Sequence, residues 1–443
     1  MIRELANNFF SKNNPCMNIL SKAPTIHPIM SIPLPKPSKE ILDNGLELYE
    51  LRMGSQEILK LEWLFDAGRW YEHKPLVARA TAKLLKSGVP GMNADELADF
   101  FDFYGAKLKI SDDFDNVSIR LYCLTKHLES LLPVMNQLFL APTFDEQELQ
   151  SFCTRNKQRL KSELQKNEVV AYRIFTETLF GNTHPYGYNS DLHHYDSLTT
   201  ADLQEHHQRC YHSNACKLIV SGKTNDQSLA IIRSYAAALK PGIKATTLKV
   251  PPIPATIPNT LHLPPAKSSM QASIRIGSKL FDNKHPDYAA FYFVNTLLGG
   301  YFGARLMQNL REDKGYTYSV YSSMEMMEHG SYFYIYTDVN SDVKDAALQE
   351  IYNEIQRLQE EPVSDEELEM LRNYMLGMVL SLVDGVFSIS AVIKELISEG
   401  LDIADFDRFE RLVKVIREIT PQQIQEIARK YFNREQLLEV VVG

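Results

Sequence analysis

Two stretches of the sequence match each other without a gap, and this internal repeat constrains the fold more than any other feature. TTADLQEHHQRCYHSNACKLIVSG runs from Thr199 to Gly222, and TPQQIQEIARKYFNREQLLEVVVG runs from Thr420 to Gly443. The matching pairs are Thr199 with Thr420, Leu203 with Ile424, Gln204 with Gln425, Glu205 with Glu426, Tyr211 with Phe432 and Gly222 with Gly443. Because the two stretches lie about 220 residues apart, the sequence predicts a duplicated unit of that size.

An earlier pair of segments supports the same duplication. PTFDEQEL begins at Pro142 and PVSDEELE begins at Pro362, again about 220 residues apart. Each segment predicts the start of a helix with a capping box, Thr143–Glu146 in the first and Ser364–Glu367 in the second. A unit of this length is too long for a solenoid repeat, so we expect two homologous globular domains in tandem.

Proline clusters mark the ends of the expected domains. The clusters contain Pro24, Pro28, Pro33, Pro35 and Pro37 near the N-terminus, and Pro241, Pro251, Pro252, Pro254 and Pro258 near the middle. The first cluster follows a polar start and predicts an extended arm, and the second predicts a linker between two equal halves. We therefore expect an arm at residues 1–37, a first domain at 38–240, a linker at 241–258 and a second domain at 259–443.

The hydrophobic pattern predicts strands and helices interleaved in both halves. The expected strands are Leu46–Arg52, Ile58–Phe65, Asn116–Leu124 and Ser331–Thr337, and the expected helices are Val77–Lys86, Leu128–Leu140 and Lys344–Leu358. Neighbouring strands that resemble hairpins indicate mixed or antiparallel sheets. We expect an α+β fold in which each domain has one such sheet with helices packed mainly on one face.

Composition excludes several classes of partner. The net charge is -9 and Lys and Arg form no long run, so we expect neither nucleic acid nor an anionic membrane as a partner. No stretch approaches the roughly 18 apolar residues of a membrane span, and the N-terminal residues show no signal-peptide pattern. The cysteines, Cys16, Cys123, Cys153, Cys210 and Cys216, form no Cys-x-x-Cys pair, which favours a reducing compartment. We expect a soluble cytoplasmic protein.

Two local motifs suggest chemistry that their surroundings do not support. Lys217–Thr224 reads KLIVSGKT, which resembles a phosphate-binding loop, but such a loop requires a glycine at the position of Lys217. His206 and Cys210 lie four residues apart on one helix and could in principle ligate zinc. The matching helix of the second half has neither histidine nor cysteine at those positions. We therefore interpret both motifs as structural.

The segment Leu297–Ser323, LLGGYFGARLMQNLREDKGYTYSVYSS, contains the main candidate site. Gly299 and Gly300 follow an apolar helix and permit a tight bend or the close approach of a bound chain, so they are candidate substrate-binding residues. Arg311 and Tyr318 lie on either side of a further glycine, where helix gives way to strand. Taken alone, this pattern indicates a helix that ends at that glycine and is followed by an aromatic strand.

This segment resembles a known family. LLGGYFGARLMQNLREDKGYTYSV is similar to the second domain of the pitrilysin/insulinase-type zinc peptidases, which include the mitochondrial processing peptidases and their bacterial relatives. In that family a Gly-rich stretch precedes an L-R-E-x-x-G-x-x-Y pattern, which Leu310–Tyr318 matches. The duplication, the central linker and the GRWYE segment are similar too, so the resemblance covers roughly residues 40–443.

The resemblance also identifies what this chain lacks. In the family, two histidines of an H-x-x-E-H helix in the first domain hold zinc, and the glutamate between them activates water. The corresponding helix here reads VARATAKLLKSG and places Ala78, Thr81 and Ala82 at the three catalytic positions. The distal ligand would fall near Thr154, with Glu163 as the nearest carboxylate in the same helix. None of the twelve histidines lies in an H-x-x-E-H string, so we expect no metal and no cofactor in this chain.

The resemblance implies a role for the second domain. In bacterial two-subunit members of the family, a metal-free subunit supplies an Arg and Tyr pair from its second domain to a zinc-bearing partner. Arg311 and Tyr318 match that pair in residue type and spacing. The implied function is the non-catalytic, substrate-binding subunit of a heterodimeric zinc peptidase, with zinc in a homologous partner subunit and a peptide as substrate.

Other functions stay open at this point. One is a structural or scaffolding protein, like the metal-free core subunits of respiratory complexes in the same family, and another is a stand-alone peptide-holding module. The presence of both Arg311 and Tyr318 favours the peptidase subunit, because a scaffold has no chemical need for the pair. An autonomous zinc peptidase is the function that fits this sequence least.

Overall fold

The computed structural model describes residues 29, 32–243, 253–254, 258–267, 270–402 and 406–443. Most of the expected arm at 1–37 and of the expected linker at 241–258 lies outside these residues. From Pro33 to Gly443 the chain forms one compact unit, which contains all the elements described below. The predicted boundaries between arm, domains and linker stay predictions.

The strands of the first half form a six-stranded mixed sheet. Its order is β1 (Ser38–Ile41), β2 (Glu47–Arg52), β8 (Cys216–Gly222), β3 (Ile58–Phe65), β7 (Val117–Leu124) and β6 (Lys107–Asp112). Strands β2 and β8 run parallel, and the other neighbours run antiparallel. β3 is central and almost entirely buried, which fits its apolar sequence ILKLEWLF. A separate two-stranded ribbon is formed by β4 (Gly88–Val89) and β5 (Met92–Asn93).

The second half repeats this topology in a five-stranded sheet. Its order is β11 (Val320–Met327), β12 (Gly330–Asn340), β10 (Gln271–Leu280), β13 (Leu438–Val442) and β9 (Thr260–Leu263). One pair, β13 and β9, is parallel, in the place that β8 and β2 occupy in the first sheet. The matched strand ends of the sequence repeat are β8 and β13, which both pair with the central strand of their sheet. The α+β fold of two homologous halves is therefore confirmed.

Helices follow the strands in the same order in both halves. The first half contains α3 (Val77–Leu84), α4 (Ala94–Phe103), α5 (Leu128–Leu140), α6 (Glu146–Glu163), α7 (Asn167–Phe180), α8 (Leu192–Asp196), α9 (Thr200–Cys210) and α10 (Asp226–Ala237). The second half contains α11 (Tyr288–Asn295), α12 (Lys344–Glu360), α13 (Asp365–Leu382), α14 (Val386–Ser398), α15 (Asp407–Glu418) and α16 (Pro421–Tyr431). The repeated helices α9 and α16 both begin with a threonine capping box, at Thr199 and Thr420.

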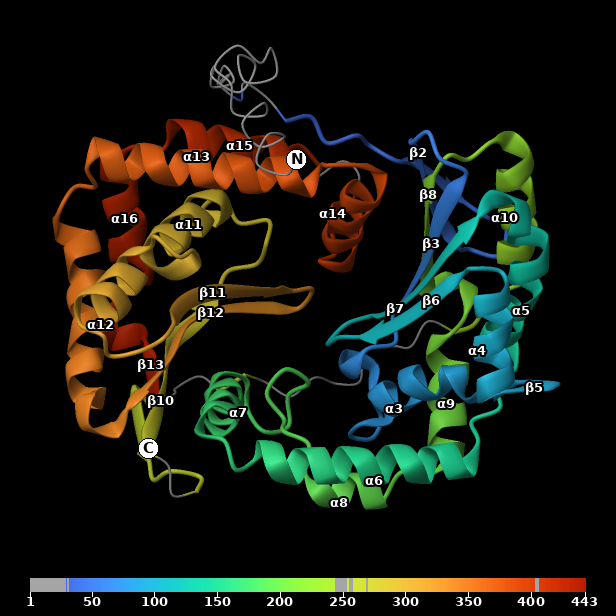
Figure 1. Ribbon diagram of the computed structural model, residues 1–443, viewed down its shortest axis with the longest axis horizontal. Coiled ribbons are helices and arrows are strands. Elements are labelled where there is room, and N and C mark those ends of the chain that lie inside the picture. The colour runs from blue at the N-terminus through green and yellow to red at the C-terminus, as the bar shows by residue number, and fades with distance from the viewer. Residues whose placement is uncertain (1–28, 30–31, 244–252, 255–257, 268–269, 403–405) are drawn as a thin grey trace, which may run out of the picture. The chain divides into compact units, whose positions relative to one another are not determined.

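Two helices pack against the sheet of the opposite half. Helix α7 of the first half contacts β10 and β13 of the second sheet, and α14 of the second half contacts β8 of the first sheet (Figure 1). The Nδ2 of Asn167, at the start of α7, donates to the carbonyl of Gln271 over 2.7 Å. In the other direction, Ser221 of β8 donates to Ser390 of α14 over 2.8 Å. Each half therefore covers part of one face of the other half's sheet.

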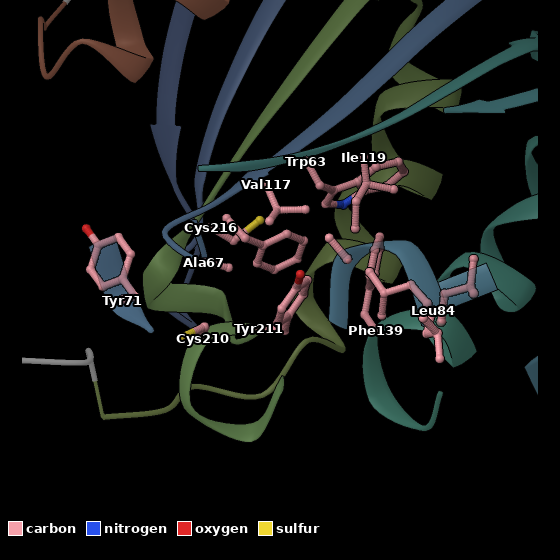
Figure 2. Close-up of a cluster of buried hydrophobic side chains, with 14 of the residues drawn as sticks. Trp63, Ala67, Tyr71, Leu84, Val117, Ile119, Phe139, Cys210, Tyr211 and Cys216 are labelled. Carbon is pink, nitrogen blue, oxygen red and sulfur yellow. The ribbon is translucent and has the colours of Figure 1, made fainter. Parts of the chain in front are cut away.

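The core of the first half lies between its sheet and the helices that cover the other face. Figure 2 shows Trp63, Val117 and Ile119 of the sheet together with Phe139 of α5 and Leu84 of α3. The rings of Trp63 and Phe139 lie 5.1 Å apart between centroids. Burial of each such side chain contributes about 1.5–3 kcal/mol, so this cluster is a main source of stability for the half.

One predicted helix start is wrong. The expected capping box at Thr143–Glu146 does not form, because Phe144 adopts a left-handed conformation with φ of 44°. Helix α6 begins instead at Glu146, and the side chain of Asp145 accepts from the backbone N–H of Gln147 and Glu148. The repeated start is correct in the second half, where Ser364 accepts from the N–H of Glu367 over 3.2 Å.

Within the described residues, no single helix is long and apolar enough to cross a membrane. Among these residues, only the two helices α13 and α14 taken together, which are bent by 101° relative to each other, have sufficient length and apolar character.

Candidate functional site

The segment with the candidate arginine and tyrosine is an unusual helix end. Met307–Asp313 forms a π-helical turn, in which the N–H of Lys314 donates to the carbonyl of Asn309 over 3.0 Å. Gly315 follows with φ of 66°, the left-handed conformation that commonly terminates a helix. A Cβ at Gly315 would meet nothing within 4 Å, so backbone conformation is the reason for this glycine. The predicted helix end is confirmed.

Arg311 and Tyr318 both reach solvent. The Arg311 side chain is 35% exposed, and its nearest carboxylate, that of Glu312, lies 3.7 Å away. Its guanidinium also lies 4.6 Å from the ring centroid of Phe302. Tyr318 is 90% exposed, which is rare for an aromatic side chain that contributes to a core. Neither side chain is required to fill the interior, so both are available to a ligand.

The backbone beside Tyr318 is nevertheless fixed. The hydroxyl of Thr317 bonds to the carbonyl of Asp338 over 2.8 Å and accepts from the hydroxyl of Thr337 over 3.0 Å. The N–H of Ser319 donates to the same Thr317 hydroxyl over 3.1 Å. The loop is therefore tied to β12 at residue 317, and the tyrosine at 318 is presented from an anchored backbone.

Gly299 and Gly300 end a second π-helical turn, Thr296–Gly300. A Cβ at Gly299 would lie 2.7 Å from the backbone nitrogen of Ser322, so this glycine allows the helix to approach β11 closely. The same contact is held by Asn295, whose Nδ2 donates to the carbonyl of Ser322 over 3.1 Å. The close approach predicted for Gly299 therefore has a partner within the chain itself. A role for either glycine in substrate binding stays a prediction.

The three degenerate zinc positions lie in the interior. Ala78, Thr81 and Ala82 of α3 are all buried, and the Thr81 hydroxyl has no hydrogen-bond partner. The exposed face of α3 carries Arg79 and Lys83, which lie four residues apart like the histidines of an H-x-x-E-H helix.

Both exposed cations pair with Asp112 of β6. The carboxylate lies 4.0 Å from the Nε of Arg79 and 2.6 Å from the Nζ of Lys83. Sequence reasoning missed these three residues, although the i, i+4 cation pair on α3 was a usable signal.

The residues around α3 do not fit a zinc ion. A zinc site needs three or four ligands of the His, Cys or carboxylate type, and no such group of three converges among the described residues. Two cations occupy the exposed face, and they would repel a further positive ion. At the distal position, Thr154 is exposed, and Glu163 pairs with Lys166 over 3.2 Å.

One partly buried carboxylate near α3 accepts a hydrogen bond from the start of the helix. Glu72 accepts from the N–H of Ala78 over 3.1 Å and from the hydroxyl of Tyr188. Burial raises the pKa of Glu72 to about 7, despite these hydrogen bonds. The carboxylate satisfies a backbone donor at the start of α3, so its position has a structural explanation.

The other two motifs are structural, as interpreted from sequence. His206 is fully buried, with Nε2 at 3.0 Å from the carbonyl of Ala67 and Nδ1 at 3.9 Å from the Cys210 sulfur. Burial lowers the pKa of His206 to about 3, so the ring is neutral. In the second motif, Lys223 pairs with Glu57 rather than facing an open loop.

Comparison with known proteins relates this region to a described family. Residues 197–375, which include both Arg311 and Tyr318, match the family described as Peptidase M16 inactive domain. This part of the chain is similar to a peptidase M16 inactive domain. This finding confirms the resemblance to the insulinase-type peptidases, and it agrees with the absence of the H-x-x-E-H motif. The matched range excludes α3, so it says nothing about the degenerate helix.

Relatives of the M16 domain cover most of the chain. An uncharacterized zinc protease, YmxG, of Bacillus subtilis is 22% identical over 359 residues, which is 80% of this chain and 85% of the relative. A protein named non-peptidase homolog YmxG, from Helicobacter pylori, is 25% identical over 312 residues, which is 68% of this chain and 69% of the relative.

Solved structures agree with the fold. A peptidase M16 inactive domain from Pseudomonas fluorescens has a TM-score of 0.83 at 23% identity, and covers 92% of this chain and 98% of its own. A protease from Helicobacter pylori has a TM-score of 0.80 at 16% identity, and covers 93% of this chain and 100% of its own. These likenesses establish an M16-like fold for the chain.

Proposed function

We propose that this chain is the non-catalytic, substrate-binding subunit of a heterodimeric zinc peptidase, and that it donates Arg311 and Tyr318 in trans to the zinc site of a homologous partner. The observation that carries the proposal is the exposure of Tyr318 from a backbone tied to β12 through Thr317. Tyr318 is 90% exposed, so its phenol is available to a ligand or to a partner subunit.

The chemistry of the pair suits peptide hydrolysis. Zinc in the partner would supply the activated water and polarise the scissile carbonyl. Arg311 has only a 3.7 Å contact to Glu312 and a cation–π contact to the exposed Phe302 ring to lose, so its guanidinium can turn to a substrate carbonyl. The phenol of Tyr318 can donate a hydrogen bond to the oxyanion that develops on that carbonyl. Both groups would act on the substrate, and neither needs a metal in this chain.

The test begins with the partner. Tagged chain is recovered from its native extract, and a co-purifying protein of similar size with an H-x-x-E-H motif is the expected partner. Peptide hydrolysis by the reconstituted pair is then measured with Tyr318→Phe. We expect turnover to fall by about a hundredfold to a thousandfold, as is typical for loss of one oxyanion donor.

The matched control is Tyr316→Phe, which removes a half-buried hydroxyl two residues away in the same loop. We expect this variant to retain turnover, and we expect Arg311→Lys to raise KM because the bidentate guanidinium is lost. Equal turnover for wild type and Tyr318→Phe would rule out the role of the tyrosine.

A second candidate function is a structural or peptide-holding protein of the same fold. It is favoured by the name of the Helicobacter pylori relative, which describes a non-peptidase homolog. Recovery of the chain alone, with peptide binding but without hydrolysis, would favour this second function. Cytoplasmic localisation belongs to both proposals, and fractionation of the native cells would test it.

A further inference from the structure

One face of the second sheet carries a ladder of tyrosines. The antiparallel register places Arg275 of β10 opposite Tyr336 of β12, and Tyr336 opposite Tyr321 of β11. Side chains at directly paired positions lie on the same face of a sheet. Tyr334 and Tyr332 follow on the same face, two and four residues before Tyr336. Helix α7 covers the end of this face at Tyr332 and Tyr334. Tyr321 and Tyr336 lie beyond that contact and are only partly buried, so this part of the face remains accessible.

Arg275 is a buried cation on this face. Its side chain is only 8% exposed, and its Nε has no hydrogen-bond partner. Within the described residues its guanidinium makes no ion pair, and its hydrogen bonding is one long contact of 3.4 Å from Nη2 to the carbonyl of Glu168. The guanidinium lies 4.8 Å from the Tyr336 ring and 5.8 Å from the Tyr334 ring. Ring stacking offsets part of the cost of burial but leaves the positive charge without a counter-ion.

Two acidic residues lie on this face, and neither forms an ion pair with Arg275. Asp338 lies opposite Ser273, two residues from Arg275. Glu325 lies opposite Tyr332, four residues along β11 from Tyr321, and accepts from the hydroxyl of Tyr334 over 3.5 Å. Burial raises the pKa of Glu325, which further weakens it as a counter-ion. Among the described residues, no carboxylate of the sheet therefore lies within ion-pair distance of Arg275.

The first half demonstrates that the fold itself does not require such a charge. Ile219 of β8 and Val440 of β13 correspond in the repeat, and they pair with Glu62 and Arg275 respectively. Glu62 is thus the counterpart of Arg275, and it is also buried. Its carboxylate lies 2.5 Å from the ammonium of Lys60, so the first half neutralises the charge internally.

We propose that Arg275, with Tyr321 and Tyr336, forms a binding site for a peptide carboxylate. A planar guanidinium binds a carboxylate through two parallel hydrogen bonds. A single cation in a chain of net charge -9 suits a single negative charge better than a phosphate group or a polyanion. The tyrosine rings supply apolar contact area and hydroxyl groups for the rest of the peptide. The carboxylate is either the C-terminus of the peptide or an acidic side chain.

The test uses the isolated full-length chain and three fluorescein-labelled peptides that differ only in the carboxylates they carry. The first has a free C-terminus, the second is C-terminally amidated, and the third is amidated with one internal glutamate. Fluorescence polarisation at constant salt should give binding at least about tenfold tighter for the first or third peptide than for the second, as expected for a hydrogen-bonded charge. Preference for the first alone identifies a C-terminal site, and preference for both identifies a general carboxylate site. Equal binding of all three peptides, or no binding, overturns the proposal.

Variants locate the binding. Arg275→Gln should abolish the preference for a carboxylate, and Arg155→Gln, at an exposed position of α6, should retain it. If Arg275→Gln does not fold, Tyr321→Trp provides a fluorescent reporter, because both natural tryptophans, Trp63 and Trp70, are buried in the first half. Saturating free-acid peptide should change the emission of this reporter, and an unchanged emission overturns the location. The test needs no partner subunit, so its failure leaves the proposed role of Arg311 and Tyr318 standing.

Discussion

At one matched position each sheet buries a charged side chain, and the surroundings of the two charges differ. In the first sheet Glu62 is buried beside Lys60, and the carboxylate also accepts from the Ser118 hydroxyl over 2.5 Å. In the second sheet Arg275 is buried beside tyrosines, and it forms no ion pair with any described residue. A duplicated fold therefore keeps its topology while the two copies diverge in whether their polar groups are satisfied.

The same difference extends to the surface. The exposed face of α3 in the first half is closed by ion pairs from Arg79 and Lys83 to Asp112. The second half instead leaves Tyr318 in solvent. Unsatisfied and exposed groups carry a cost in stability, and they are retained where a ligand or partner provides the compensation. The comparison supports our proposal that the functional surface lies in the second half.

The largest expected effect concerns the two buried charges. Lys60→Met leaves the buried Glu62 with only the distant Arg120, whose Nε lies 3.9 Å away, so we expect the free energy of unfolding to fall by about 3 kcal/mol. Arg275→Met leaves no carboxylate unpaired, so we expect a change within about 1 kcal/mol. Urea titration at pH 7 measures both values.

The double variant Lys60→Met with Glu62→Leu is the control for this contrast. It removes both charges and should recover most of the lost stability, because an apolar pair of similar volume is often as stable as a buried ion pair. If Arg275→Met destabilised the chain as much as Lys60→Met, Arg275 would have a structural partner, and the contrast between the sheets would fail.

The next effect concerns the two faces of α3. Ala78→His with Ala82→His places two imidazoles where both methyl groups are already buried, so overpacking should cost about 1–3 kcal/mol per site. Arg79→His with Lys83→His replaces exposed residues and should cost less than about 1 kcal/mol in total.

Zinc binding separates the two double variants further. The exposed histidine pair lies at i, i+4 beside Asp112, so calorimetry should detect zinc binding by that variant. Zinc binding by the Ala78→His with Ala82→His variant instead would mean that this face of α3 is accessible to a metal ion. Ala78, Thr81 and Ala82 would then again be the positions that correspond to a zinc site.

Local signals in the sequence predicted much of the fold. Strand β3 and helix α5 have the predicted bounds, because hydrophobic periodicity and burial act over a few neighbouring residues. The start of α6 was missed because the left-handed Phe144 shifts the cap by two residues, and a propensity for capping does not encode that dihedral angle. Gly315, which ends the helix before Tyr318, was predicted correctly because the left-handed conformation at a helix end strongly favours glycine.

The candidate sites depend on contacts that local patterns do not contain. Arg275 and Tyr336 are neighbours only through the register of β10 and β12, and the significance of Arg275 lies in a missing counter-ion. Asp112 meets Arg79 and Lys83 only after β6 packs beside α3. The pair of Arg311 and Tyr318 was identified by resemblance to a family, and the structure adds its exposure.

The smallest expected effect concerns the hairpins β6–β7 and β11–β12, a further matched pair, whose tips contact each other. Asp115 of the first hairpin accepts from the Tyr186 hydroxyl over 2.5 Å and from the N–H of Glu328 of the second hairpin over 3.1 Å. Burial raises the pKa of Asp115 to about 7, although these hydrogen bonds oppose the shift. The first half thus supplies a titratable acid to this contact, and the second half supplies a backbone donor.

The sign of the pH dependence follows from the raised pKa of Asp115. Its carboxyl binds a proton more tightly in the folded chain than in the unfolded chain, so its contribution to stability is complete below about pH 4 and is lost as pH rises through about 7. Asp115→Asn cannot titrate, so the stability of wild type relative to this variant should fall by about 1–3 kcal/mol between pH 5 and pH 8. Urea titrations of both proteins at the two pH values measure this difference, and the exposed Asp102→Asn should show almost none of it. A difference that stayed constant with pH would mean that Asp115 is ionised throughout, and the contact between the hairpins would then be held by a charge, as the Lys60–Glu62 pair is.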